Sequence, residues 1–482
     1  MAGLISSLMS SSKALTAHSK GLETAGKNLA NINNVGYARQ RVELGDLGSI
    51  KTATGTESMG VEVLALQQMR DTLIDRQVMR EISSGSRLSA SQRVLQSTES
   101  ALGQQIDRTN DSSSIANSPQ STGGGISETL SDFFNAFESL SVSPQDIGEK
   151  QTLLQKANIL AEKLNSADSR LGQVQTDVDA QIDADLEKVS NILSAIAGLN
   201  ESIGMAENGR PYSAVDLRDQ RQAKIEELSE FFDVNVATIP NSNGQIQITA
   251  KDSGGADVVL VDKKTVNGQI TYDTTSTPKS FTFSSTPAVT LSFSSGSLKG
   301  QLDTRDGAVQ TLRDELVALA DQLRISVNAA YNPLSTVGQN FFTDPTPAGK
   351  LLEVNTSLTA ATIKTTNTAS PGANELILAV AQVANTQFST ASGDEIDGTP
   401  AMFFSSAVSE IAQTLSSTTT RLEDQQLSEE YIRTRRDEVS GVSQDEELTD
   451  LMKFQRSFQA SSKYVNILDG LLDLVVNRLG NG

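Results

Sequence analysis

Few side chains in this sequence can support acid–base or metal chemistry. His18 is the single histidine among 482 residues, and the chain has no cysteine. A His-x-x-x-His zinc helix, a thiolate metal site and a disulfide are therefore excluded. His18 recurs at heptad spacing with apolar residues, so we interpret it as a packing or register residue rather than a catalytic base.

A group of four aspartates lies in the middle of the chain: Asp177, Asp179, Asp183 and Asp185. Closely spaced carboxylates can hold calcium, but the glycine and the terminal glutamate of a calcium loop are missing here. The surrounding residues have helical periodicity, which predicts a solvated helix face instead.

A short basic run could bind an anionic ligand. It consists of Arg433, Arg435 and Arg436 and lies next to Glu429, Glu430, Asp437 and Glu438. Opposite charges three and four residues apart pair along a helix surface, and this explains the run without a ligand. No phosphate-binding Gly-Lys-Ser/Thr loop and no Gly-x-Ser-x-Gly elbow occurs. The sequence predicts no enzyme, no cofactor and no metal.

The charge balance limits the partners. The chain carries 39 Lys+Arg against 59 Asp+Glu, a formal net charge of -20, which disfavours nucleic acid and an anionic membrane surface. No segment approaches the roughly 20 apolar residues of a membrane span. Lysines run through the N-terminal segment instead of preceding an apolar core, so we expect secretion without a cleaved signal peptide.

Both ends of the chain have the periodicity of amphipathic helices. We predict one helix from Leu4 to Asn33 and another from Asp445 to Leu479. In both segments, apolar residues recur in alternating steps of three and four. The first segment is basic and the last acidic, which favours pairing of the two. We predict that the following residues form the assembly interface: Leu8, Leu15, Leu22, Leu29, Ile32, Leu451, Phe454, Phe458, Val465, Leu468, Leu472, Val475 and Leu479.

The middle of the chain combines a long helix with a β-rich segment. Apolar residues from Leu153 to Leu199 recur every three or four positions, which predicts a helix of about 80 Å over 150–202. Between Val234 and Leu302 the period becomes two, with Ser, Thr and Gly between the runs, which predicts strands and tight turns. Phe341 and Phe342 look buried.

These patterns predict a mainly α, elongated fold with an inserted all-β domain. Residues 1–45 and 437–482 are expected to form paired coiled-coil helices as an inner domain. Residues 46–232 and 303–436 are expected to form a helical rod domain, partly irregular or β over 331–400. Residues 233–302 are expected to form a β-rich outer domain.

Several segments resemble flagellar rod, hook and hook-associated axial proteins. The stretch Asn28–Gln40 resembles their N-terminal signature, and its site residues are Asn28, Asn31, Gly36, Tyr37, Arg39 and Gln40. Its Asn and Gly residues also suggest a left-handed end to the first helix. The segments 440–447 and 454–463 resemble the C-terminal block, and 216–221 and 338–342 resemble internal landmarks of the hook-associated members.

The resemblance implies a structural subunit between hook and filament, outside the cell in the bacterial flagellum. The partners it implies are copies of itself in a ring, hook protein below, a second junction protein and filament above, and a cytosolic export chaperone on the C-terminal helix. Alternatives are another axial protein of hook or flagellin type, or a secreted coiled-coil protein of unrelated role.

Overall fold

The computed structural model describes residues 2–34, 36–46, 48–52, 55–58, 60–102, 125–209, 213–276, 278–285, 287–344, 349–367 and 372–474. The α-helices are α1 (Ala2–Ala30), α2 (Thr72–Ala101), α3 (Ile126–Val142), α4 (Ile147–Ala206), α5 (Val215–Ser229), α6 (Ser297–Thr304), α7 (Gln310–Tyr331), α8 (Glu375–Val383), α9 (Pro400–Ser440) and α10 (Gln444–Asp473). A π-helical turn, Arg305–Val309, joins α6 to α7, and Thr390–Ser392 is a 3-10 turn.

The strands form small antiparallel sheets. They are β1 (Gln40–Asp46), β2 (Ser49–Thr52), β3 (Gly55–Ser58), β4 (Val61–Gln68), β5 (Asn235–Thr238), β6 (Ile246–Lys251), β7 (Asp257–Asp262), β8 (Thr265–Val266), β9 (Ile270–Asp273), β10 (Ser280–Phe283), β11 (Val289–Leu291), β12 (Phe342–Thr343) and β13 (Glu353–Val354). The sheet orders are β1-β4, β2-β3, β5-β6-β7-β8, β11-β10-β9 and β12-β13.

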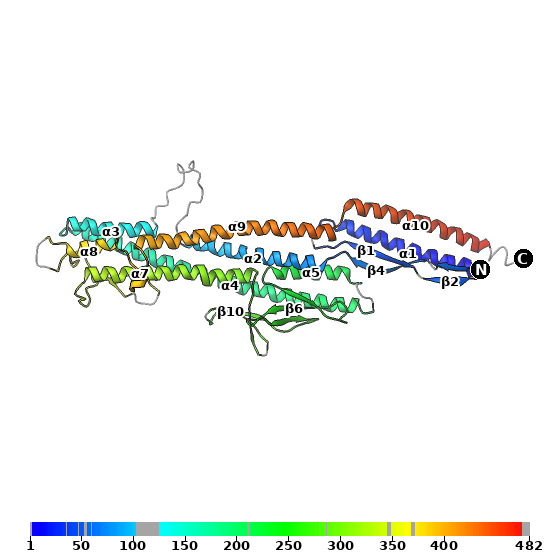
Figure 1. Cartoon of the computed structure of the whole chain (residues 1–482), viewed down its shortest axis with the longest axis horizontal. Helices are drawn as coiled ribbons and strands as arrows, with labels where there is room; N and C mark the ends of the chain where they lie inside the picture. Colours follow the sequence, from blue (N-terminus) through cyan, green and yellow to red (C-terminus); the bar gives the residue numbers. More distant parts are fainter. Residues whose placement is uncertain are drawn as a thin grey trace.

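The molecule is elongated (Figure 1). Helices α1 and α10 lie side by side at one end, and α3 and α8 lie at the other. The long helices α2, α4, α7 and α9 form the rod between the two ends, while β6 and β10 lie along one flank of the rod. Among the described residues, no helix is long and apolar enough to cross a membrane. The prediction of a mainly helical fold with small β-sheets is confirmed.

Helix α4 confirms the long periodic stripe in the sequence. Its 60 residues correspond to about 90 Å, and every predicted core position from Leu153 to Ile196 is buried. Leu199 is only half-buried, because the buried position shifts to Asn200, which is 0% exposed. A polar residue takes that place because it anchors the neighbouring sheet.

Two of the four mid-chain aspartates correct the expectation of a solvated face. Asp179 accepts hydrogen bonds from the Tyr272 hydroxyl at 2.8 Å and from Lys279 at 3.0 Å. Asp185 is buried and accepts a hydrogen bond at 3.0 Å from Gln301 on α6. Asp177 and Asp183 are exposed as expected. The carboxylates of Asp179 and Asp185 therefore hold the sheet β9–β11 and helix α6 against α4.

The β-rich segment and the rod share one apolar core. Phe232, just after α5, stacks on Phe293 at a ring-centroid distance of 4.8 Å, and Phe281 of β10 contacts the same ring at 5.1 Å. Phe341 and Phe342 are 0% exposed, as expected, and pack against Phe133 of α3. The strands end at Leu291 and α6 begins at Ser297, so the end of the 233–302 segment is helical.

Asn200 should be a strong anchor of the sheet β5–β8. Its amide donates to the carbonyls of Ile246 and Lys263 at 3.1 and 2.7 Å, and its Oδ1 accepts from Arg221 at 2.7 Å. We expect Asn200→Ala to lower the free energy of unfolding by about 2–4 kcal/mol, because buried polar groups lose their partners. Urea denaturation followed by circular dichroism measures this.

Asn158→Ala is the matched control for that substitution. Asn158 lies exposed on the same helix and donates only to the carbonyl of Leu154. We expect a change below about 0.5 kcal/mol. Equal effects of the two substitutions would show that Asn200 does not anchor the sheet.

Candidate assembly site and its anchoring network

Asn28 organises the loop between α1 and β1. It is 1% exposed, and its side-chain oxygen accepts hydrogen bonds from the Tyr37 hydroxyl at 2.7 Å and from the Gln40 backbone N–H at 3.0 Å. Its amide nitrogen donates to the Gln40 carbonyl at 2.9 Å. A single side chain therefore closes a twelve-residue loop, which is why an amide rather than a carboxylate suits this position.

Glu447 connects this loop to the other end of the chain. It lies at the start of α10 and is 2% exposed, and its two oxygens accept from Arg39 Nε at 2.7 Å and from Asn28 Nδ2 at 3.0 Å. Arg39 also pairs with the exposed Glu446 at 2.6 Å. Burial disfavours the charge on Arg39, but the carboxylates of Glu447 and Glu446 outweigh it and raise the Arg39 pKa.

The contacts between α1 and α10 show that the two helices are antiparallel. Asn28 meets Glu447, while Gly21, two turns earlier in α1, meets Phe454, two turns later in α10. A Cβ on Gly21 would lie 2.7 Å from the Phe454 ring, so only glycine fits there. The His18 ring lies 6.5 Å from the same phenylalanine, and burial lowers the pKa of His18. His18 is thus a half-buried packing residue, as expected.

The remaining motif residues line the same loop. Asn31 donates to the Lys27 carbonyl at 2.9 Å, and the Gly36 carbonyl accepts from Arg70 Nη2 at 3.1 Å. Burial, and then the negative charges of Asp219, Asp216 and Glu447, raise the pKa of Tyr37 well above its usual range. Gly36 does not have a left-handed backbone, so the expected left-handed helix end is wrong at this residue.

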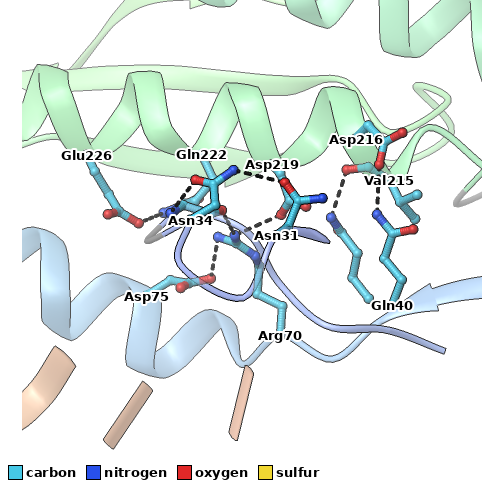
Figure 2. Close-up of polar contacts among 12 residues, drawn as sticks. Asn31, Asn34, Gln40, Arg70, Asp75, Val215, Asp216, Asp219, Gln222 and Glu226 are labelled. Atoms are coloured by element: carbon cyan, nitrogen blue, oxygen red, sulfur yellow. Dashed lines mark hydrogen bonds and ion pairs between the residues drawn. The ribbon is translucent and has the colours of Figure 1, made fainter. Parts of the chain in front are cut away.

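A polar joint connects the loop to α5 (Figure 2). Gln40 donates to Asp216 at 2.7 Å, and Gln68 donates to the Val215 carbonyl at 2.8 Å. Arg70, between β4 and α2, pairs with Asp219 at 2.9 Å and with Asp75 at 3.4 Å. The landmark segment 216–221 therefore receives the N-terminal loop on its acidic face.

Helix α9 reaches the same joint through Arg436. This residue is 5% exposed and pairs with Glu226 of α5 at 3.1 Å, while Arg433 pairs with Glu429 along its own helix at 2.7 Å. The prediction of helix-surface pairing is confirmed for Arg433 and wrong for Arg436, because Glu226 of α5 supplies its carboxylate partner.

Burial perturbs the two aspartates that share Arg70. It raises the pKa of Asp219 to about 6 despite the nearby guanidinium. It also raises the pKa of Asp75, again against the opposing effect of Arg70. One arginine between two buried carboxylates leaves the joint with an excess of negative charge. Protonation of Asp219 relieves that excess.

The described residues of the predicted interface lie on α1 and α10, except Ile32, which follows the end of α1, and only Leu468 is fully buried. Ile32 is 37% exposed, and the other described members are half-buried. Val475 and Leu479 lie outside the described residues. The most buried positions of α1 are small or polar: Ser11, Ala17, Gly21, Thr24, Ala25 and Asn28. These small residues lie where α1 is covered by neighbouring elements, which leaves the leucines partly accessible.

Two sequence models match separate parts of the chain. Residues 112–342 match the flagellar hook-associated protein FlgK helical domain, and residues 434–479 match the flagellar basal body rod FlgEFG protein C-terminal region. Flagellar hook-associated protein 1 of Bacillus subtilis is 25% identical over 529 residues, which cover 98% of this chain and 97% of that protein. Over nearly its whole length, the chain is therefore similar to flagellar hook-associated protein 1.

Other proteins with the same name match over a smaller share. The Escherichia coli protein is 24% identical over 360 residues, which cover 72% of this chain and 61% of that protein. The solved hook junction protein FlgK from Burkholderia pseudomallei superposes with a TM-score of 0.45 and 21% identity, covering 56% of this chain and 47% of that one. These matches support a structural role for the chain in the flagellum.

Sequence reasoning missed several residues of this anchoring network. Arg70, Asp75 and Glu226 lie in no quoted motif, and each contacts a partner far away in sequence. Glu447 lies within a quoted segment, but nothing local shows that it is buried. Among the described residues, no group of three or more His, Asp or Glu side chains is placed to hold a metal ion.

Removing Glu447 should loosen α10. Glu447→Ala leaves Arg39 and Asn28 without their shared acceptor, and a lost buried charged hydrogen bond costs about 1.5–3 kcal/mol. We expect amide hydrogen exchange over 444–460 to accelerate about ten- to a hundredfold. Glu446→Ala, at a 62% exposed side chain, should change exchange less than about threefold. Similar effects of both variants would contradict the assigned role of Glu447.

Asp219 should make stability depend on pH. Its pKa is about 6 in the folded chain and about 3.9 in an unfolded one. The folded state therefore binds the extra proton between about pH 4 and pH 6, and Asp219 lowers the free energy of unfolding as pH rises through that window. Relative to Asp219→Asn, the wild type should lose roughly 2–3 kcal/mol between pH 4 and pH 7. Urea denaturation at each pH measures the free energy of unfolding of both proteins. If the two values change with pH in parallel, this prediction is wrong.

Proposed function

We propose that the chain is a structural subunit at the junction between hook and filament, and that it is not an enzyme. The observation that carries the proposal is the near full-length match to a protein named flagellar hook-associated protein 1. The elongated shape and the joined chain ends support it (Figure 1). As an axial subunit it would act outside the cell.

A second candidate function is that of a hook-type axial subunit. The match of residues 434–479 to the C-terminal region of flagellar rod proteins favours it. The two roles differ in what the cell builds without the protein. A junction subunit is needed only after the hook is complete, whereas a hook-type subunit is needed for the hook itself.

The terminal helices are the proposed assembly surface. Helix α10 has an exposed row of large apolar side chains: Leu448, Met452, Tyr464, Ile467, Leu471 and Leu474. Within one copy, only Leu468 and Glu447 of α10 are buried. A helix of this length gains most of its stability from packing, and exposed apolar rows mark interaction surfaces. We propose that neighbouring axial subunits cover this row.

The half-buried residues of α1 and α10 have a different role in this proposal. The predicted seam residues on α1 and α10, from Leu8 to Ile32 and from Leu451 to Leu472, hold the two helices together as a coiled-coil pair. The exposed row then meets copies of this chain in a ring, hook protein below, and a second junction protein and filament above. An export chaperone would cover α10 before assembly.

The domain layout follows from this role. We propose that residues 1–45 with 437–482 form the inner layer, that 46–232 with 303–436 form the rod around it, and that 233–302 form the outer, solvent-facing part. The position of β6 and β10 on one flank of the rod supports the last assignment (Figure 1).

Deleting the gene in the source bacterium separates the two axial roles. We expect hooks without filaments and flagellin released into the medium. Electron microscopy of the cell surface and immunoblots of the medium measure both. Cells that lack hooks as well would favour the hook-type role, and cells with normal filaments would refute both.

Complementation of that strain tests the proposed surface. Ile467 is 60% exposed, so Ile467→Asp should leave the monomer folded and secreted. In an assembly it would forfeit roughly 1.5–3 kcal/mol of apolar burial and place an unpaired charge in an apolar contact. We expect no filaments. Asn466→Asp adds the same charge at the exposed neighbouring position and should restore filaments. Full filaments with secreted Ile467→Asp would exclude this row from the interface.

A further inference from the structure

A cavity of about 630 Å³ lies beside α5. It is bounded by Gln68 and Arg70 at the end of β4, by the start of α2, by α5, by strand β5 and by the turn 239–245. The segment 216–221 of α5 contributes acidic side chains to the N-terminal loop and basic side chains to the cavity. Asp216 and Asp219 face the terminal loop, as Figure 2 shows, whereas Arg218 and Arg221 line the cavity.

Two of the four arginines that line the cavity are neutralised by carboxylates. Arg218 Nε lies 2.7 Å from Glu207 Oε1, and its Nη2 donates to Oε2 at 2.7 Å. Arg70 is shared by Asp75 and Asp219. The turn is shaped around the first pair, because a Cβ on Gly244, whose φ is 76°, would lie 2.3 Å from a Glu207 oxygen.

The other two arginines have no carboxylate partner among the described residues. Arg221 is only 6% exposed, and both of its hydrogen bonds use Nη1, to Asn200 Oδ1 at 2.7 Å and to the Gly244 carbonyl at 2.8 Å. Its Nε and Nη2 are left without a protein partner in the described part of the chain, while the residue lines the cavity. Arg76 of α2 lies at the same cavity and is exposed.

An uncompensated buried guanidinium is costly and favours an anion. Burial, and then the nearby charge of Arg218, lower the pKa of Arg221 to about 10 against the opposing effect of Glu207, so the group stays charged at neutral pH. A buried charge without a directly bonded counter-charge is unfavourable. Guanidinium groups prefer the planar, bidentate geometry of carboxylates and phosphates. In a chain of net charge -20, this local excess of positive charge stands out.

We propose that this cavity binds an oxyanion, a carboxylate or a phosphate, between Arg221 and Arg76. The anion has two possible sources, a free anion from solution or an acidic side chain of a second copy of this chain. In both cases its charge completes the pairing of Arg221. The site is separate from the terminal helices, so it does not depend on the proposed assembly surface.

Titration of the full chain with inorganic phosphate or citrate tests the proposal. Calorimetry at ionic strength held constant with chloride should show saturable binding. Arg76→Gln removes one arm of the site at an exposed position and should weaken binding about tenfold, equivalent to about 1.4 kcal/mol. Arg80→Gln, one turn further along α2, removes an exposed charge outside this cavity and should change affinity less than about twofold.

A second variant and a second measurement complete the test. Arg221→Gln should abolish binding, and circular dichroism shows whether that variant keeps its fold; Arg76→Gln decides the matter if it does not. Sedimentation at low salt identifies the source, because self-association that phosphate reverses and Arg76→Gln weakens assigns the anion to a second copy. Phosphate binding without self-association assigns it to solution. If neither phosphate nor citrate binds saturably and no Arg76-dependent association occurs, or if Arg76→Gln and Arg80→Gln weaken binding equally, the proposal is wrong.

Discussion

A carboxylate buried at the start of the last helix has to be paired, and that requirement holds the two ends of the chain together. Glu447 is 2% exposed and obtains its partners, Asn28 and Arg39, from the other end of the sequence. A buried carboxylate without partners would cost several kcal/mol. The pairing therefore fixes which part of α10 lies beside which part of α1, and it closes the loop that carries the family motif.

The rest of the rod follows the same rule of apolar stripes with sparse polar anchors. Helix α4 buries a continuous stripe, and at intervals a polar side chain attaches another element to it. Asn165 holds the backbone of Leu351 and Leu352, Asn200 holds the sheet β5–β8, and Asp185 holds α6. Apolar stripes let helices slide and rotate against one another, whereas these hydrogen bonds allow only one register. The ion pairs of Arg70 with Asp75 and Asp219 likewise fix the position of the N-terminal loop relative to the rod.

The sequence predicted well whatever depends on periodicity. The stripe from Leu153 to Ile196 is buried as expected, and the strands around Ile246 and Phe281 follow their alternating pattern. The pairing of β1 with β4 was not predicted, because neither strand has a fully buried face: apart from Gln40, their side chains are half-buried or exposed. Local pattern carries no information about distant partners, so Asp179, Asp185 and Arg436 looked like surface charges. In α1, small residues are buried where a leucine seam was expected, because Gly21 makes room for Phe454.

The central claim is that α1 and α10 form one antiparallel pair fixed at the Asn28–Glu447 end. Distances between spin labels measure this directly, and a chain without native cysteine allows clean labelling. Ser19, Gln455 and Asp469 are exposed labelling sites. Double electron–electron resonance should give a short, narrow distribution for labels at 19 and 455, and a clearly longer distance for labels at 19 and 469, because position 469 lies about 21 Å further along the axis of α10 at a rise of 1.5 Å per residue. Equal distances, or two broad overlapping distributions, would contradict the pairing.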